Sequence, residues 1–589
     1  MKDGTGTVIL QCPEKGCWLR FSRPLQVVAA RHPDEVQPAL RRIDEAVSRQ
    51  RRFAAGFVSY EAAPGCDRAL KVRSSPDMPL VWFGIYKDAE AVNMQGDFGV
   101  SVQPLVWTAT VSREEYESVL HDIKGRIAAG VTYQVNYTYR LRAPFDGDPL
   151  KYFRGLAGGG KAGYAAFVDA GRWAVCSASP ELFFRVKDGT LVSRPMKGTA
   201  PRGRTLREDG EHTRWLEDSE KNRAENIMIV DMIRNDIGRI AEIGSVEVPR
   251  LCEVERFPTV LQMTSTVRAR VPGSFSAIMT ALFPCASITG APKVSTMGII
   301  AEVESTPRGL YSGAIGYVAP DGDGLEAQFN VAIRTVTIDR TLGRAEYGVG
   351  GGILWESEPR EEYRECEIKS RVLMQGQRTG PLSLELREAI LWTPAEGYFL
   401  LDRHLARLAE SALFFDIPLD LSALRTALDE TGARLRGEGH KVRISLDRRG
   451  KAAVTAQPLS AIPRPAVQRV CLAAQPVDSS DLRLYHKTGS RDAFERELSA
   501  HPACSDVLLW NERGEVTESC TANIVADVAG ARITPPVSCG LLAGIFRSML
   551  LEEGAITEGI LPKDSLRSAT AIWLINSVRK WMPAVLVDQ

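Results

Sequence analysis

The sequence lacks the features that mark secreted, membrane-spanning and zinc-binding proteins. Its eleven cysteines, scattered from Cys12 to Cys539, form no C-x-x-C pair, so neither a zinc site nor a disulfide framework is expected. The opening stretch MKDGTGTVILQCPEKG has no continuous apolar core like that of a signal peptide. No uninterrupted apolar run reaches membrane-spanning length. We therefore expect a reduced, cytoplasmic protein with no membrane partner.

An excess of charge of one sign is missing as well. Lys and Arg together number 73, as do Asp and Glu, so the formal net charge is zero. This balance argues against nucleic acid as the main partner. Hydrophobic residues make up 44% of the chain and charged residues 25%, which is typical of a globular protein.

The chain has no short-period repeat and no low-complexity tract, but at 589 residues it is long enough for several domains. The stretch VLMQGQRTGPLSLELREA (372–389) places Gly376, Gly380 and Pro381 between a charged helix and a new amphipathic segment. We predict one domain over 1–375 and a second over 376–589, each of mixed α and β structure.

A lysine in the first half stands in an unusually constrained segment, SRPMKGTAPRG (193–203). Upstream, LFFRV and TLVSRPM are typical of strands, and KDGT supplies an Asp-Gly hairpin turn. Such a hairpin brings Glu181 near Lys197. From these residues alone, an exposed lysine or a plain salt bridge explains the pair as well as catalysis does.

Three further acids of the first half draw attention. The stretch 218–240 predicts a helix that Asp218 or Ser219 can cap, and Glu225 leads into its apolar part. Glu362 and Glu365 lie three residues apart on one face of a second predicted helix. Surface acids are the default interpretation, but magnesium also prefers a few carboxylates.

The ordered motifs of this half resemble the chorismate-utilising enzymes, which include the large components of anthranilate and aminodeoxychorismate synthases. The motifs that carry the resemblance are SPELF, PMKGT, AENIMIVDMIRND, SITGAPK, GLYSGAIGY, FNVAIRT and GGGILWESEPREEYRE. They run from about Tyr133 to Lys369. The resemblance implies an α+β fold with antiparallel sheets around the active cleft.

The resemblance also implies roles for individual residues. Anthranilate synthases usually carry alanine where this chain has Lys197, whereas aminodeoxychorismate synthases carry lysine. Lys197 would then be a nucleophile toward chorismate, and Glu181 the general acid for the departing 4-hydroxyl. The implied magnesium ligands are Glu225, Glu362 and Glu365. The implied substrate-binding residues are Ser287, Tyr311, Arg334, Gly352 and Lys369.

The sequence differs from these enzymes at one position and lacks a recognisable ammonia-producing domain. Gln262 stands where many relatives have histidine, which puts any proton shuttle there in doubt. No glutaminase domain is recognisable in the sequence. Glutamine-derived ammonia would therefore come from a separate amidotransferase subunit.

In the second half, Arg407 lies on a predicted helix and Lys487 in the segment LYHKTGSRDAFE, where a surface position is the default. Glu518 ends a predicted hairpin. A loop feeds a helix at about Gly544, whose first amides can cradle a phosphate, although ordinary capping explains the loop equally well.

The motifs HLARL, YHKTGSR, GEVTESCTAN, GLLAGIFR and NSVR resemble the fold-type IV, or class IV, pyridoxal-phosphate enzymes, an α/β fold. The likeness covers roughly 384–585. It implies that Lys487 holds the cofactor as a Schiff base and that Glu518 pairs with the pyridine nitrogen. The implied phosphate ligands are Arg407, the amides of Ile545 and Phe546, and Ser577. Ala389 and Lys580 depart from the usual threonine and glycine.

The class IV family includes branched-chain and D-amino-acid aminotransferases as well as aminodeoxychorismate lyases, which its motifs separate poorly. The fused first half favours the lyase, because a lyase would consume what the first half makes. The prediction is therefore synthesis of 4-aminobenzoate from chorismate and ammonia, with Mg²⁺ and pyridoxal 5'-phosphate as cofactors. Anthranilate synthesis, transamination and a chorismate-sensing module remain alternatives. The class also allows a homodimer through the second half.

Overall fold

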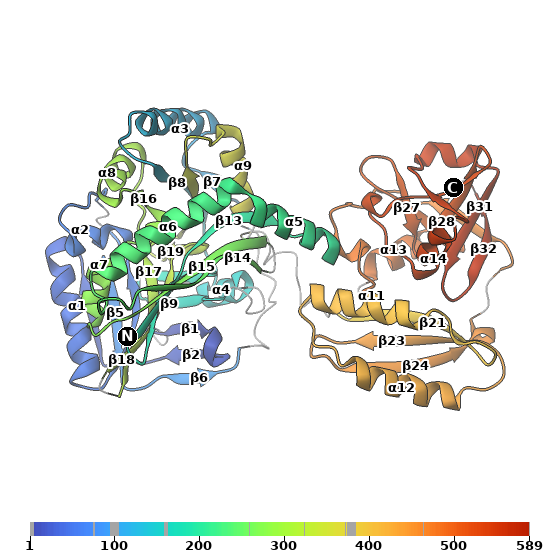
Figure 1. Cartoon of the computed structure of the whole chain (residues 1–589), viewed down its shortest axis with the longest axis horizontal. Helices are drawn as coiled ribbons and strands as arrows, with labels where there is room; N and C mark the ends of the chain where they lie inside the picture. The colour runs from blue at the N-terminus through green and yellow to red at the C-terminus, as the bar shows by residue number, and fades with distance from the viewer. Residues whose placement is uncertain are drawn as a thin grey trace. The chain divides into compact units, whose positions relative to one another are not determined.

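The computed structural model divides the chain into two compact units (Figure 1). The first unit comprises 1–201 and 213–381, and the second comprises 202–212 and 382–589. The structure describes residues 5–74, 77–94, 105–157, 163–257, 260–322, 324–370, 373, 384–462, 465–489 and 491–587. The predicted boundary at 375 lies outside the described residues. The segment 202–212 differs from the prediction, because it belongs to the second unit.

Two ten-stranded sheets with antiparallel pairings form the frame of the first unit. One sheet has the order β16 (Gly290–Ala291), β8 (Gln134–Pro144), β20 (Arg344–Ile353), β19 (Thr335–Asp339), β10 (Trp173–Ser177), β9 (Ala166–Ala170), β1 (Val8–Cys12), β2 (Cys17–Phe21), β6 (Glu90–Val92), with β7 (Thr108–Ala109) on β8. The other has the order β13 (Met196–Pro201), β15 (Val260–Arg270), β12 (Thr190–Arg194), β11 (Leu182–Lys187), β18 (Gly324–Val331), β17 (Ala314–Asp321), β4 (Phe53–Val58), β5 (Val81–Tyr86), β3 (Gln26–Ala30), with β14 (Glu247–Arg256) on β15.

Helices pack against these sheets. They are α1 (Pro33–Ser48), α2 (Ala63–Cys66), α3 (Arg113–Ala128), α4 (Pro149–Leu156), α6 (Glu220–Gly238), α7 (Phe275–Leu282), α8 (Lys293–Val303) and α9 (Pro359–Ser370). The helix α6 packs against β13 and β15, and α9 packs against β20. α5 (Leu206–Asp218) begins in the second unit and ends in the first.

Local signals explain the elements nearest to Lys197. The predicted hairpin is confirmed as β11 and β12, and its turn residues Asp188 and Gly189 both have positive φ, 50° and 69°. Positive φ at both turn residues gives the twist that a two-residue hairpin needs. The predicted cap is also confirmed, because the Ser219 side chain accepts a hydrogen bond from the Asn222 amide at the start of α6.

The second unit contains a small sheet and a larger mixed sheet. The small sheet has the order β22 (Gly397–Tyr398), β21 (Leu386–Thr393), β23 (His440–Leu446), β24 (Ala452–Pro458). The larger has the order β27 (Val516–Ser519), β26 (Asp506–Trp510), β25 (Gln468–Leu472), β32 (Lys580–Leu586), β31 (Ala571–Asn576), β28 (Asn523–Val528), β29 (Ala531–Thr534), β30 (Thr557–Glu558). The helices are α11 (Leu401–Phe414), α12 (Leu421–Arg434), α13 (Asp492–Ala500) and α14 (Ile545–Glu552).

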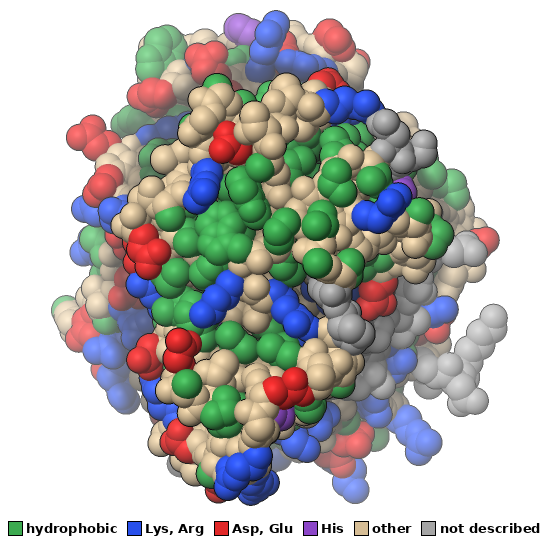
Figure 2. All heavy atoms as spheres, turned by 90° about the vertical axis from the view of Figure 1, so that its right-hand side faces the viewer, with side chains coloured by type: hydrophobic (Ala, Val, Ile, Leu, Met, Phe, Trp, Pro, Cys, Tyr) green, Lys and Arg blue, Asp and Glu red, His purple; other side chains and the backbone are tan. Residues whose placement is uncertain are grey.

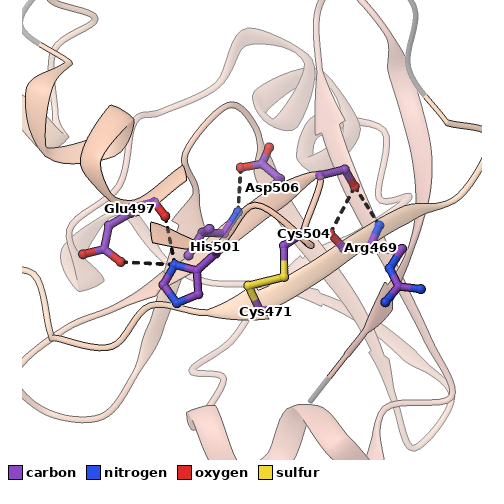
Figure 3. The surroundings of a disulfide bond; sticks show 8 residues. Arg469, Cys471, Glu497, His501, Cys504 and Asp506 are labelled. Carbon is purple, nitrogen blue, oxygen red and sulfur yellow. Dashed lines mark hydrogen bonds and ion pairs between the residues drawn. A yellow bond between two sulfur atoms is a disulfide. The ribbon is translucent and has the colours of Figure 1, made fainter. Parts of the chain in front are cut away.

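One disulfide corrects the expectation drawn from the cysteine pattern. Cys471 on β25 and Cys504 just before β26 are bonded, with their Cα atoms 6.3 Å apart (Figure 3). The parallel pairing of β25 with β26 brings these two segments together, since Cys471 is in register with Val507. The other nine cysteines are free thiols. None of the described helices is long and apolar enough to cross a membrane.

Candidate active sites

Lys197 in the first unit lies on a strand segment whose backbone is held from both sides. Gly198 has φ +85°, and a Cβ there would lie 3.0 Å from Asn222 of α6, so a side chain is disfavoured at this position. From β15, the Gln262 amide donates a 2.8 Å hydrogen bond to the Gly198 carbonyl and accepts one of 3.0 Å from Thr199. Gln262 therefore braces the Lys197 backbone, a contact that does not depend on titration.

Glu181 is buried beside this strand, as the hairpin prediction required. Ser287 donates a 2.6 Å hydrogen bond to its carboxyl group, and the backbone of Met196 hydrogen bonds to it as well. Burial raises the pKa of Glu181 to about 7, although Ser287 and Lys197 act in the opposite direction. A carboxyl group with this pKa can deliver a proton near neutral pH.

A glycine run on β20 passes close to the Lys197 amine. A Cβ on Gly352 would lie 3.1 Å from Lys197 Nζ and 2.5 Å from Gln134 Nε2, so only glycine leaves this space open. Gln134 is 1% exposed, and its Nε2 has no hydrogen-bond partner among the described residues. Such a donor is costly to bury unpaired, so it is available to a ligand. Gln134 was not among the residues predicted to bind substrate.

Opposing electrostatic effects act on Lys197. Burial lowers the pKa of its amine, and Glu225 on α6 acts in the opposite direction. Burial likewise raises the pKa of Glu225, against the influence of Lys197. A lysine must be neutral to act as a nucleophile, so a lowered pKa increases its reactive fraction at neutral pH.

The other two predicted metal ligands lie on α9, where it packs on β20. Ser357 donates a 2.7 Å hydrogen bond to Glu362, and Lys369 forms a 2.8 Å ion pair with Glu365. Lys369 lowers the pKa of Glu365, whereas burial, and then Glu365, raise the pKa of Glu362. A Cβ on Gly351 would lie 3.3 Å from the Glu362 carboxylate, so this cluster faces the glycine run.

The acids fit magnesium only in part. Among the residues that the structure describes, no three His, Cys, Asp or Glu side chains are close enough to hold a metal ion. Glu365 nevertheless raises the pKa of both Glu225 and Glu362, which is the electrostatic crowding that a cation would relieve. Magnesium needs only one or two carboxylates when an anionic ligand and water complete its shell.

Tyr311 and Arg334, both predicted to bind substrate, line the same interior. Tyr311 is buried, and a Cβ on Gly348 would contact its ring. Arg334 has φ +50°, and burial lowers the pKa of its guanidinium group. Lys369, the remaining predicted ligand, donates a 3.0 Å hydrogen bond to the Gly350 carbonyl.

The second unit contains a cavity of about 640 Å³. Its lining includes most of the residues predicted to bind pyridoxal phosphate: Arg407, Lys487, Glu518, Ile545 and Ser577. Burial lowers the pKa of Lys487 to about 8 and raises that of Glu518 to about 8. Each influences the other, so the lysine and the acid share one low-dielectric space.

Arg407 is fixed by a buried acid that the sequence analysis missed. The Arg407 guanidinium makes two 2.8 Å hydrogen bonds to Glu388 on β21, and His404 lies 2.7 Å from the same carboxylate. Burial alone would raise the pKa of Glu388, but Arg407 and then His404 lower it to about 2. Because Glu388 orients Arg407, the guanidinium is preorganised at the cavity wall.

The start of α14 offers bare amides to the same cavity. Gly544 precedes the helix without any side-chain cap, and a Cβ there would lie 2.0 Å from Asn523. Uncapped amides at a helix start bind phosphate well, and Ile545 and Phe546 supply the first two. Lys580 has φ +56°, which explains why glycine is common at that position. The donor set therefore fits pyridoxal phosphate.

Comparisons with known proteins identify one family in each half of the chain. Residues 97–375 match the family model for chorismate binding enzymes, and residues 385–587 match that for class IV amino-transferases. The chain is 43% identical over 272 residues to aminodeoxychorismate synthase component 1 of Klebsiella aerogenes, covering 46% of this chain and 59% of that protein. It is 33% identical over 349 residues to anthranilate synthase component 1 of Methanothermobacter marburgensis, covering 54% and 73%.

The crystal structure of anthranilate synthase component I from Streptococcus pneumoniae TIGR4 matches with a TM-score of 0.52 at 24% identity. That match covers 62% of this chain and 92% of the other, and it supports the fold alone. The chain spans less than two thirds of the length of the aminodeoxychorismate synthases that it matches.

The environment of Lys197 leads to a test by chemical labelling. Glu225→Gln removes a carboxylate that favours the charged amine, so the pKa of Lys197 should fall further. Competitive acylation read by mass spectrometry should then show the labelling midpoint of Lys197 shifted to lower pH. Glu242→Gln, an exposed acid of the same unit, is the control. An unchanged or higher midpoint in the Glu225 variant would contradict this electrostatic account.

Proposed function

The chain belongs to the family of chorismate binding enzymes, and from that premise we propose that it makes 4-aminobenzoate from chorismate and ammonia in two steps. The first unit would replace the 4-hydroxyl of chorismate by an amine. The second would eliminate pyruvate from the resulting 4-amino-4-deoxychorismate. The observation that carries the proposal is Lys197, a half-buried lysine beside Glu181 whose pKa is lowered by desolvation.

In the proposed first step, the neutral Lys197 amine forms a bond to the second ring carbon. The two conjugated ring double bonds each shift by one position as the bond between the fourth carbon and its hydroxyl breaks, and they shift back when ammonia adds. Glu181 gives its proton to that hydroxyl, which leaves as water; its pKa of about 7 suits this role. Ammonia then bonds to the fourth carbon, and the Lys197 amine departs from the second.

Substrate binding in this proposal follows from the groups around Lys197. Chorismate carries two carboxylates, and Arg334 and Lys369 supply positive charge for them. Magnesium would be held by Glu225 and Glu365, with Glu362 assisting, and it would neutralise a substrate carboxylate. The unpaired Gln134 amide is free to donate to the bound ring's oxygen atoms.

In the second unit, pyridoxal phosphate would supply an electron sink for the carbon that bears the amine. Lys487 would remove the proton from that carbon and return a proton to the departing enolpyruvyl group. Glu518 would keep the ring nitrogen protonated, while Arg407, Ser577 and the α14 amides would hold the phosphate. The burial of Lys487, with its pKa of about 8, suits proton transfer near neutral pH.

Charge in the second cavity favours a lyase over an aminotransferase for simple amino acids. Along β23, Val442 and Ile444 are buried in the core, so Arg443 between them points to the opposite, cavity-lining side. Arg491 and Arg579 line the same cavity. Among the described residues, these three arginines form no ion pair with an acid, although Arg491 and Arg579 donate hydrogen bonds to backbone carbonyls. Their positive charge therefore favours a substrate with two carboxylates.

The proposal includes partners and a location. A separate glutamine amidotransferase would supply ammonia, in keeping with the component 1 name of the matched relatives. A homodimer through the second unit is also proposed. Hydrophobic side chains gather on one face of the molecule (Figure 2), and the second unit exposes Val467, Ile560 and Val585. Nine of the eleven cysteines are free thiols, and this majority favours the reducing cytoplasm despite the Cys471–Cys504 bond.

The whole reaction can be tested with the purified chain. Given chorismate, ammonium, magnesium and pyridoxal phosphate, it should release 4-aminobenzoate and pyruvate in equal amounts without any keto acid. Lys197→Ala should reduce the amination rate by at least about 100-fold, because it removes the nucleophile. Lys487→Ala should instead accumulate 4-amino-4-deoxychorismate. Products are separated by chromatography.

Each half of this proposal would be contradicted by a different result. Anthranilate as the main product would refute the role given to Lys197. Amination followed by transamination that depends on a keto acid would refute the lyase. Binding of chorismate without turnover would point to a sensing module.

The acidic cluster predicts the magnesium dependence. Glu225→Gln and Glu365→Gln should each raise the magnesium concentration for half-maximal amination by about tenfold or more, because each removes a carboxylate ligand. Glu367→Gln, an exposed acid on the same helix, serves as the matched control. Pyridoxal absorbance should not change in any of them. A magnesium requirement unchanged from wild type in both variants would mean that these acids are structural.

The three arginines that line the second cavity lead to a prediction about substrate affinity. Arg443→Gln should raise the KM for 4-amino-4-deoxychorismate about tenfold, which corresponds to losing one charge-assisted hydrogen bond of about 1.4 kcal/mol. The kcat should change less, because Arg443 is assigned to binding. Arg449→Gln, an exposed residue of the following turn, is the control. Equal KM values for the two variants would exclude Arg443 from the substrate site.

A further inference from the structure

A short segment inside the chorismate-binding match belongs to the second unit. Residues Arg202–His212, here called the strap, follow directly on β13 and precede the rest of the second unit by a long stretch of sequence. The strap lies within the 97–375 match, so the family comparison alone would assign it to the first unit. Its contacts with the second unit are specific, and they converge on the residues next to Lys487.

The strap has a defined internal structure. Arg202 makes hydrogen bonds of 3.0 and 2.9 Å to the two oxygens of Asp209, which is 2% exposed. The Gly203 amide donates a 2.7 Å hydrogen bond to the same carboxylate, and a Cβ there would lie 2.4 Å from the Asp209 nitrogen. Arg204 pairs with Glu208 at 2.7 Å. These bonds present two arginines in fixed positions.

Both arginines contact aromatic residues of the second unit. The Arg202 guanidinium lies 4.6 Å from the Phe414 ring centroid and donates a 3.2 Å hydrogen bond to the Phe414 carbonyl. The Arg204 guanidinium lies 5.0 Å from the Tyr485 ring centroid and donates a 2.8 Å hydrogen bond to its hydroxyl. Stacking and hydrogen bonding from one guanidinium restrict both the distance and the orientation of its partner.

The residue before Lys487 completes the contact. His486 Nε2 lies 3.0 Å from the Arg204 carbonyl, and its Nδ1 lies 3.0 Å from Ser411 Oγ. A carbonyl only accepts, so Nε2 carries the proton and the neutral ring accepts from Ser411 through Nδ1. Burial lowers the pKa of His486 to about 4, in keeping with this neutral form. The Phe414 and Phe415 rings, at 4.4 and 4.7 Å, enclose the imidazole.

The other side of the same loop is held by the small sheet. The Arg387 amide on β21 donates a 2.8 Å hydrogen bond to the Lys487 carbonyl, and Thr488 forms a bridge with Leu386. The backbone that carries Lys487 thus contacts β21 on one side. On the other side, Tyr485 and His486 hydrogen bond to the strap. A lysine that must reach a cofactor carbon needs its backbone fixed in this way.

We propose that the strap is a positioning element for Lys487, acting through Arg204 and His486. This inference rests on the proposed use of pyridoxal phosphate at Lys487. It adds that the second unit needs residues encoded within the chorismate-binding region to hold its lysine in place. Arg204 and His486 contact neither substrate nor cofactor in this scheme.

The full chain allows a matched set of variants. Arg204→Ala removes the contact with Tyr485, and His486→Phe keeps a ring but removes both hydrogen bonds. His486→Gln retains an N–H donor for the Arg204 carbonyl. Arg207→Ala is the control, because this arginine lies on the same strap with its side chain 81% exposed.

Two measurements do not depend on turnover. The first is the dissociation constant of pyridoxal phosphate, with the pH midpoint of its visible absorbance when bound. Arg204→Ala and His486→Phe should raise the constant at least fivefold and shift the midpoint, while His486→Gln and Arg207→Ala stay within twofold of wild type. The second is hydrogen exchange without cofactor, where the backbone around 484–488 should exchange faster in the first two variants only.

The outcomes separate this inference from the proposed function. If wild type binds pyridoxal phosphate at Lys487 but Arg204→Ala and His486→Phe match it in affinity, midpoint and exchange, the strap has no positioning role. If His486→Gln behaves like His486→Phe, the hydrogen bond to Arg204 is not the active contact, and the inference also fails. If wild type shows no bound cofactor, the proposed function of the second unit is overturned, and this inference with it.

Discussion

The constraint on which both sites depend is the cost of burying a lysine amine. Removal from water favours the neutral amine, and this lowers the pKa of both Lys197 and Lys487. Carboxylates close by work against the effect, Glu225 and Glu181 at the first lysine and Glu388 and Glu518 at the second. Burial thus shifts both amines toward the neutral form that a nucleophile or a proton carrier requires.

Such a balance needs a rigid backbone, because a small displacement would let water in or separate the charges. The structure supplies rigidity through contacts that leave no room for adjustment. Gly352 sits against the Lys197 amine, Gln262 braces the next peptide, and Gly544 fits against Asn523 at the start of α14. At Lys487, contacts with β21 and with the strap hold the backbone in place. Catalytic geometry here comes from the neighbours of each lysine.

Sequence reasoning succeeded where the signal was local. The Asp188–Gly189 turn, the Ser219 cap and the helix after Gly544 each depend on a few consecutive residues, and all three are present. It failed where partners are distant in the chain. Gln134 meets Gly352 only through the register of β8 with β20, and Glu388 meets Arg407 only because α11 packs on β21. The Cys471–Cys504 pair and the strap likewise depend on tertiary pairing.

The charges of the two units fit the order of the proposed reactions. Amination exchanges a hydroxyl for an amine and leaves both carboxylates of the substrate in place. The second cavity must therefore accept a dianion, and arginines on β23, at the start of α13 and after β31 line it in excess of their local acids. An aminotransferase for simple amino acids needs one carboxylate site. The surplus of cations is thus what a chain should carry when its second reaction takes the product of its first.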